Sequence, residues 1–371
     1  MAQPDNYVVA SGLPIYAGRA APAAPSGTPA WLAGQPLNTL FQIANTAGAG
    51  GAKIDAFSGI CIRQQHSKIY IALAGGHGDG LDNRVVECDL RNDAPFWNTL
   101  KAASTVGVQD TDYYPDGTPD SRHTYNSLTW CAANNRLMAL GNYGSYGNAY
   151  SYRHLDGFNP DSTPPAWDAA GTYPDSPSGT GWYTSGVDSN GNAWWFHPTT
   201  GVVAKWDPTT NAFSTYFISY PSAGRFPYAC DSLRGKMFNL EAGDGQSYNP
   251  TTWHASTFDI NTHAVANITF NSSAGLTALL ADYNQMIDAG MDYDAVNDYF
   301  LYYAAGPAPG NIYKIKPNNT TVWDVSIFAS NAPAGPTGGA GLNGRLKYVA
   351  AFKGFVLMPQ KSSNIHFVRT S

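Results

Sequence analysis

The chain has 371 residues, of which 43% are hydrophobic and only 13% are charged, about half the usual share of charged residues. The net charge of -6 at pH 7, without any run of Lys and Arg, argues against a nucleic-acid partner. The abundance of Gly (38), Pro (25) and Tyr (23) is typical of short strands joined by many turns, so we expect an all-β protein.

The N-terminal region lacks the marks of a targeting or membrane segment. Its first residues, MAQPDNYVVASGLP, have neither a basic start nor an apolar core, so we expect no secretory signal peptide. We expect the protein to be made in the cytoplasm. Residues 20–52 carry no formal charge, but four prolines and several glycines exclude a membrane helix there. We therefore expect no membrane insertion.

The four cysteines are Cys61, Cys88, Cys131 and Cys230, which are widely spaced and form no CxxC pair. This spacing is too sparse for a disulfide scaffold. We expect buried free thiols, as in a protein made in a reducing cytosol.

One pattern recurs about every 57 residues and predicts a repeat architecture. Each unit has a strand of small residues, a tight polar turn, an apolar second strand, a Gly-rich loop, and third and fourth strands. The second strands are expected at 68–73, 136–141, 192–197, 236–241, 298–303 and 354–359. In the second unit, the first strand is expected to start at 121–127 and the third strand is expected at 149–155. Most of the turns before them contain Asn, Asp or Gly, residues that adopt the positive φ such hairpins require.

The sixth unit ends at Ser371 after its third strand, expected at 364–369, so its fourth strand must come from elsewhere. Residues 28–40, TPAWLAGQPLNTL, have the same tryptophan and hydrophobic ending as the expected fourth strand at 96–100. Pairing of the two chain ends in one sheet would close a ring and remove its exposed edges.

The unit that includes ALAGGHGDGLDNRVVECDLRNDAPFWNTL (72–100) is the one most like a kelch motif. Over roughly residues 28–371 the chain resembles kelch-type β-propellers and is similar to the central domain of galactose oxidase. The resemblance implies a single β-propeller of six four-stranded blades, closed by an N-terminal strand in the last blade. A seven-bladed ring stays open as an alternative if residues 1–50 hold a degenerate blade.

The expected domains are an N-terminal arm and one propeller. The arm covers residues 1–27 and is either an attachment strap or a connector to the closing strand. The propeller covers residues 28–371, with blades at about 54–104, 120–172, 181–219, 224–273, 284–330, and 344–371 together with 28–40.

The stretch AGGHGDGLDNR (74–84) lies between a second and a third strand and lacks the Lys-Ser/Thr of a nucleotide-binding loop. We interpret its glycines as turn residues. The alternative is a cation site formed by His77, Asp79 and Asp82, in which only one histidine accompanies the carboxylates.

In a propeller, the loops that join second to third strands, and fourth strands to the next blade, lie on one face. Here these loops carry tyrosine and tryptophan, whose flat faces and polar tips suit stacking on sugar rings. The longest is 101–123. The candidate ligand-binding residues are Tyr113, Tyr114, Tyr143, Tyr146, Trp182, Arg225, Tyr248, Trp253, His254 and Arg345. The alternative is that the tyrosines only fill gaps between blades.

Alignment of the expected innermost strands predicts a ring of cations at the channel mouth. The aligned residues are Lys53, Arg122, Trp182, Arg225, Gln285 and Arg345. Such a ring could bind carboxylate or sulfate groups. Alternatively, each arginine pairs with a neighbouring loop aspartate.

An enzymatic alternative uses Arg122, His123, Tyr183 and Arg225 as the catalytic residues of a polysaccharide lyase, similar to lyases built on propeller folds. Arg and His would neutralise a uronate while Tyr moves the proton. Galactose-oxidase chemistry needs two Tyr, two His and a Cys-Tyr crosslink around copper, a pattern that the sequence lacks. We therefore expect no cofactor. A serine-hydrolase GxSxG elbow is also missing.

We therefore expect a non-enzymatic recognition or structural propeller that presents aromatic loops to a glycan or a protein. Few charges, unpaired cysteines and the Ala/Pro/Gly-rich arm resemble bacteriophage virion proteins, such as capsid decoration, tail or fibre proteins. Other virion proteins, held through the N-terminal arm, are further expected partners. A cellular cytoplasmic protein stays open as an alternative.

Overall fold

The computed structural model describes residues 27–52, 54, 58–75, 80–106, 111–141, 153–177, 184–188, 190–197, 200–218, 227–242, 253–282, 289–303, 309–335, 342 and 344–371. These residues form 24 strands, one α-helix, α1 (Ala274–Ala281), and short 3-10 turns. The expectation of an all-β protein is confirmed. No helix within these ranges is long and apolar enough to cross a membrane.

The strands form antiparallel units of four, in which each strand pairs with the next along the chain. The first unit has β2 (Cys61–Arg63), β3 (Lys68–Ala72), β4 (Val85–Asp89) and β5 (Trp97–Lys101). The second has β6 (Leu128–Cys131), β7 (Arg136–Leu140), β8 (Leu155–Asn159) and β9 (Ala166–Trp167). The third has β10 (Thr184–Val187), β11 (Ala193–Phe196), β12 (Val202–Asp207) and β13 (Ala212–Phe217).

Two further units join edge to edge into one eight-stranded sheet. One has β14 (Tyr228–Asp231), β15 (Lys236–Ala242), β16 (Trp253–Asp259) and β17 (Val265–Phe270). The other has β18 (Gly290–Asp294), β19 (Tyr299–Tyr303), β20 (Gly310–Lys316) and β21 (Val322–Ala332). The join is a short parallel pairing of β17 with β21, at Thr269 with Val322 and Phe270 with Trp323.

The last unit contains both ends of the described chain. It has β22 (Leu346–Val349), β23 (Gly354–Leu357), β24 (Ile365–Arg369) and β1 (Leu40–Ile43). β1 pairs antiparallel with β24 from Leu40 opposite Val368 to Ile43 opposite Ile365. The expected pairing of the two chain ends is therefore present.

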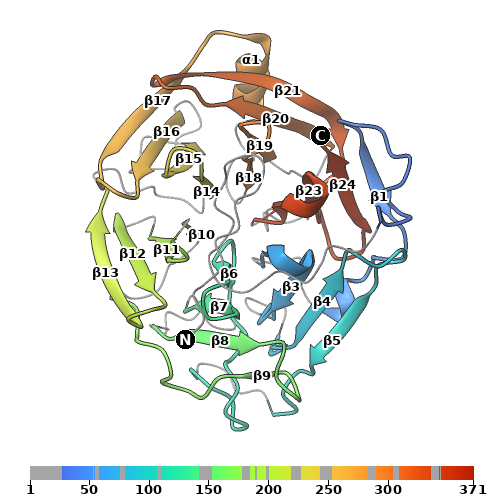
Figure 1. Ribbon diagram of the computed structural model, residues 1–371, viewed down its shortest axis with the longest axis vertical. Coiled ribbons are helices and arrows are strands. Elements are labelled where there is room, and N and C mark those ends of the chain that lie inside the picture. Colours follow the sequence, from blue (N-terminus) through green and yellow to red (C-terminus); the bar gives the residue numbers. More distant parts are fainter. Residues whose placement is uncertain are drawn as a thin grey trace, which may run out of the picture.

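The first strands of the units follow one another around a common centre (Figure 1). β2 contacts β6, β6 contacts β10, β10 contacts β14, β14 contacts β18, β18 contacts β22, and β22 returns to β2. The fourth strands lie at the periphery of the ring. The apolar core accordingly lies between neighbouring units; for example, Met138 of β7 packs in one cluster with Trp195 of β11 and Trp206 of β12.

The closing strand lies later in the sequence than expected. β1 is LFQI, so the predicted segment 28–40 contributes only its last residue. The tryptophan of that segment supports the same sheet from outside it. The Trp31 ring packs edge-on against the rings of Phe367 and Phe352, with centroid distances of 5.1 Å and 5.5 Å. Its indole nitrogen donates a hydrogen bond to the carbonyl oxygen of Leu90 at 2.9 Å.

The hairpins between first and second strands adopt the geometry that the turn residues predict. Each has a residue with positive φ just before the second strand. These residues are Ser67 (50°), Asn135 (57°), Gly191 (82°), Gly235 (61°), Asp298 (56°) and Lys353 (48°). Because these short turns need the left-handed region, Asn, Asp and Gly occupy four of the six positions.

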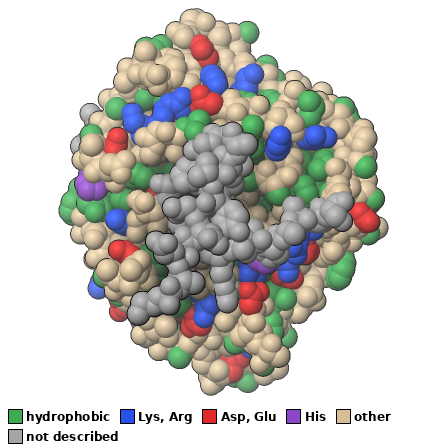
Figure 2. Space-filling view, in the orientation of Figure 1, with side chains coloured by type: hydrophobic (Ala, Val, Ile, Leu, Met, Phe, Trp, Pro, Cys, Tyr) green, Lys and Arg blue, Asp and Glu red, His purple; other side chains and the backbone are tan. Residues whose placement is uncertain are grey.

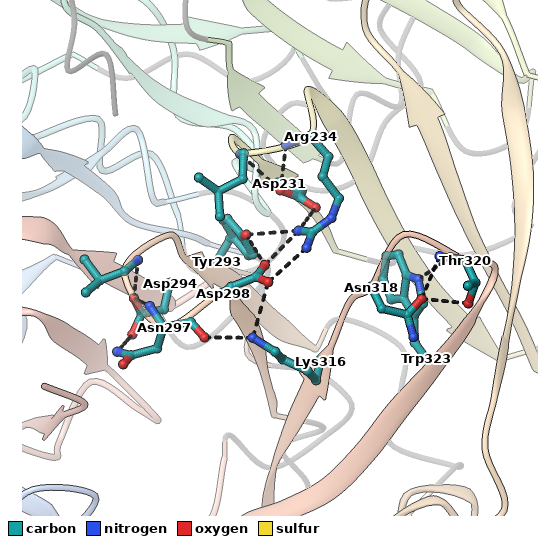
Figure 3. A network of polar contacts seen from close by, with 12 residues as sticks. Asp231, Arg234, Tyr293, Asp294, Asn297, Asp298, Lys316, Asn318, Thr320 and Trp323 are labelled. Atoms are coloured by element: carbon teal, nitrogen blue, oxygen red, sulfur yellow. Dashed lines mark hydrogen bonds and ion pairs between the residues drawn. The ribbon is translucent and has the colours of Figure 1, made fainter. Parts of the chain in front are cut away.

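Polar contacts between these hairpins tie neighbouring units together, and Figure 3 shows one such network. Arg234, between β14 and β15, lies 2.8 Å from Asp231 and 2.7 Å from Asp298 in the next unit. The hydroxyl of Tyr293 donates to Asp298 at 2.6 Å, and Lys316 donates to it at 3.2 Å. The network fixes the spacing of two adjacent units.

Two local expectations are wrong. The third strand of the second unit is β8, which begins at Leu155; of the expected range 149–155, residues 149–152 lie outside the described ranges and residues 153–154 precede the strand. The first strands also begin later than expected, and residues 121–127 precede β6 as a buried loop. The left-handed φ of Tyr125 (40°) and a turn in which Ser127 donates to the Thr124 carbonyl interrupt any strand there.

Candidate functional site

A buried polar segment, residues 118–127, directly precedes β6 in the sequence. The amide of Arg122 donates to the carbonyl of Leu73 at 2.9 Å, and the hydroxyl of Thr124 accepts from the amide of Gly59 at 3.1 Å. The side chain of Asn126 accepts from Lys347 of β22 at 2.6 Å. The segment therefore joins the first, second and last units, and its charged side chains must be compensated locally.

Arg122 is compensated by two carboxylates. Its Nε lies 3.3 Å from Asp120 Oδ1 and its Nη2 lies 3.1 Å from Asp156 Oδ2. Arg122 and Asp120 are fully buried, and Asp156 is 6% exposed. Burial raises the pKa of Asp156, whereas the charge of Arg122 opposes that rise. The guanidinium thus acts as the counter-ion of its own loop.

Tyr113 extends this buried network toward the surface. Its hydroxyl donates to Asp156 Oδ1 at 2.9 Å. Burial, followed by the neighbouring Asp156 carboxylate, raises the pKa of Tyr113, so the phenol keeps its proton near neutral pH. Its ring is half-buried and lies 5.4 Å from the imidazole of His154.

His154 lies between two exposed carboxylates. Its Nδ1 is 2.7 Å from Asp175 Oδ1 and its Nε2 is 3.1 Å from Asp112 Oδ2. Asp112 precedes β6, His154 precedes β8 and Asp175 follows β9, so three separate loops of the second unit meet here. We call Asp112, Tyr113, His154 and Asp175 the His154 cluster.

The loop that carries Asp112 and Tyr113 is held by its own hydrogen bonds. The amide of Tyr114 donates to the carbonyl of Thr118 at 2.8 Å, and Tyr113 forms an isolated bridge with Pro119. Asp116 Oδ1 accepts from the hydroxyl of Thr118 at 2.6 Å. Tyr114 is buried and donates to the carbonyl of Leu81. The loop therefore presents the His154 cluster in a fixed arrangement.

Carboxylate oxygens and a tyrosine ring on one exposed surface are the groups that bind sugars: the oxygens accept hydrogen bonds from hydroxyls, and the ring packs on the apolar face of a pyranose. Asp112 and Asp175 are about half exposed, with side-chain exposures of 44% and 58%. Each retains oxygens that can accept further hydrogen bonds.

The predicted cation ring is not reproduced by the two members that the structure describes. Arg122 precedes its first strand by several residues, whereas Arg345 directly adjoins β22, so the two are not at equivalent positions. Arg345 is fully buried and donates to the carbonyls of Ile54, Ser58 and Pro359. The alignment failed because the expected first strands were placed too early.

The remaining described candidates lie in different surroundings. His123 and Tyr125 are each 3% exposed, and His123 Nδ1 lies 2.7 Å from the Tyr125 hydroxyl. Trp253 begins β16 and stacks on Phe270 at 5.0 Å. His254 contacts Asn267 of the neighbouring strand at 3.1 Å. The structure does not bring these residues into the His154 cluster.

Several predicted residues lie outside the described ranges. They are Tyr143, Tyr146, Trp182, Tyr183, Arg225 and Tyr248, together with His77 and Asp79 of the suggested cation site and Lys53 and Gln285 of the suggested cation ring. Asp82, the described member of the cation site, accepts from the side chain of Arg84 at 2.9 Å. Within the described ranges, no group of three or more His, Cys, Asp or Glu is arranged to hold a metal ion.

Sequence reasoning missed His154, Asp156, Asp120 and Asp175. His154 was missed because it lies within 149–155, where the third strand was expected. Asp175 lies in a loop from a fourth strand to the next unit, and the rule that located the predicted face could have found it.

Figure 2 shows the face that looks down the centre of the ring. Lys and Arg side chains lie beside Asp and Glu side chains at several places around it. The visible part of this face therefore carries both signs of charge. Searches against protein-family models and curated protein sequences find no match to this chain.

Proposed function

We propose that the chain is a single kelch-type β-propeller of six four-stranded blades. The circuit of first strands and the pairing of β1 with β24 support this proposal. In a closed ring the chain ends share one blade, which leaves no unit with an incomplete sheet. The parallel join of β17 with β21 is then a peripheral contact between two blades.

The function that the geometry supports best is recognition of a glycan, without chemical turnover, at the His154 cluster. The observation that carries the proposal is the contact of His154 with both Asp112 and Asp175 beside the Tyr113 ring. The imidazole fixes two exposed carboxylates at a set separation, so they can accept hydrogen bonds from hydroxyls on one sugar. Recognition sites gain affinity from such preorganisation.

The surroundings of the arginines also favour recognition over a lyase. A uronate that approached Arg122 would compete with Asp120 and Asp156, both already desolvated with it. The hydrogen bond between His123 and Tyr125 is the feature that a lyase would use. With both side chains 3% exposed, a polysaccharide cannot contact them in this arrangement.

The setting that we propose for this recognition is a bacteriophage virion. The low share of charged residues and the free cysteines support it. Mass spectrometry of purified particles from a lysate that expresses the gene would detect the chain at fixed stoichiometry. Its recovery only in the soluble host fraction would overturn this setting.

A glycan array tests the recognition function. We expect the wild-type protein to bind a discrete set of glycans and the Asp112→Asn/Asp175→Asn double variant to lose them. Asp324→Asn, an exposed carboxylate elsewhere on the ring, is the matched control and should bind as the wild type does. Equal binding by the double variant would overturn the assignment of the site.

A further inference from the structure

A pocket of about 580 Å³ lies at the periphery of the ring, between β1 and β21. Five consecutive residues, 38–42, line one side of it, and four consecutive residues, 328–331, line the other. Side chains of a strand alternate between its two faces. Contact with consecutive residues therefore means that the pocket runs along the edges of both strands, where main-chain groups are available.

Both strands pair on one side only in this region. Among the described residues, β1 pairs with β24 alone. β21 pairs with β20 along its length, and its contact with β17 uses only Val322 and Trp323. The end of β21 that approaches β1 thus has an open edge (Figure 1). Open edges of this kind accept an added strand.

The lining of the pocket is partly polar and contains no Asp, Glu, Lys or Arg. His366 of β24, which is 6% exposed, lines it together with the amide side chains of Asn38, Gln42 and Asn331.

We propose that this pocket binds residues 6–10 of the same chain, NYVVA, as an added strand between β1 and β21. Tyr and Val favour extended structure, and the segment is uncharged like the pocket lining. The 16 residues at 11–26 link it to the described chain and can span up to about 50 Å. A linker of this length gives an effective concentration of about millimolar, which favours the chain's own segment over a second copy.

Hydrogen exchange followed by mass spectrometry on the full-length protein tests this proposal. Val8→Pro removes a main-chain donor and should release the segment. We expect amides of residues 6–10, 38–42 and 328–331 to exchange at least about tenfold faster in this variant than in the wild type. Ala23→Pro, in the Pro/Ala-rich linker, is the matched control and should leave these rates unchanged.

Unchanged exchange in β3 shows that the Val8→Pro variant is folded. If residues 6–10 of the wild type exchange at the rate of an unstructured peptide, the proposal is wrong. If their protection falls when the protein is diluted, the occupant is a second copy and the proposal is again overturned. These outcomes do not depend on glycan binding.

Discussion

Nη2 of Arg122 lies 3.1 Å from Oδ2 of Asp156, and both side chains are buried. Asp156 belongs to β8, whereas Arg122 belongs to the loop before β6. The ion pair therefore anchors the buried segment 118–127 to its own sheet. Through Tyr113, which donates to the other oxygen of Asp156, it also positions the His154 cluster.

Removal of Arg122 should destabilise the protein strongly. Arg122→Met leaves Asp120 and Asp156 buried without their cation, and breaking a buried pair in this way costs about 3–5 kcal/mol. Urea unfolding at pH 7 measures the loss. Arg91→Met, which breaks a more exposed pair with Asp89, is the control and should cost less than about 1 kcal/mol. Equal effects of the two variants would contradict this account of Arg122.

Trp31 should stabilise the closure of the ring, although it lies outside the closing strand. Trp31→Ala removes its contacts with Phe352 and Phe367 and its hydrogen bond to Leu90. We expect a loss of about 3 kcal/mol in the free energy of unfolding. Phe96→Ala, at a 58% exposed site, should change it by less than about 0.5 kcal/mol. A Trp31→Ala variant as stable as Phe96→Ala would refute this role.

Asp298 should contribute to the loss of stability in acid. Burial opposes ionisation, but hydrogen bonds from Arg234, Tyr293 and Lys316 outweigh it and lower the pKa of Asp298 to about 2. Its pKa in the unfolded chain is about 3.9. Because the folded-state pKa is the lower one, the stabilisation is present above about pH 5 and is lost as the pH falls toward 2.

The Asp298→Asn variant tests this contribution, since Asn tolerates the same positive φ. Its free energy of unfolding should be lower than that of the wild type at pH 7 and should fall less steeply between pH 5 and pH 2. Denaturant titrations at several pH values measure both slopes. Parallel pH profiles for the two proteins would show that Asp298 does not carry this effect.

Lys353 occupies the left-handed region in the last hairpin, with φ of 48°. Its side chain is exposed, so Lys353→Gly removes backbone strain without loss of core packing. We expect stabilisation of up to about 1 kcal/mol, because the backbone strain relieved in the folded state exceeds the free-energy cost of the greater freedom of glycine in the unfolded chain. Thermal unfolding measures the shift. Lys353→Val, which is β-branched, should instead destabilise, and the same sign for both variants would contradict the account.

The repeat and its turns could be predicted from the sequence because the signals are local. The second strands begin within one residue of their expected positions, since their apolar runs follow turn residues such as Asn135 and Gly235. The closing strand was less visible. Residues 40–43 have no feature that separates them from any other short apolar run. Trp31 suggested a strand, but it lies in a turn and packs against the sheet from there.

The candidate site was predicted only in part, because its members meet through tertiary contacts. The loop 101–123 was singled out, and it contributes Asp112 and Tyr113. His154 and Asp175 come from loops whose positions depend on where β8 begins and β9 ends, and these two short strands have weak patterns. Arginine is a residue type that often binds anionic ligands, but Arg122 is buried beside Asp120 and Asp156 and serves as their counter-ion.

The most direct test of the central claim is calorimetric titration of a glycan selected on the array, with parallel incubation of the protein with acidic polysaccharides. We predict saturable binding that weakens about tenfold or more in Asp175→Asn, with no growth of unsaturated-uronate absorbance. Absorbance that rises with time in the wild type and is abolished by His123→Ala and Arg225→Ala would contradict the account and establish a lyase.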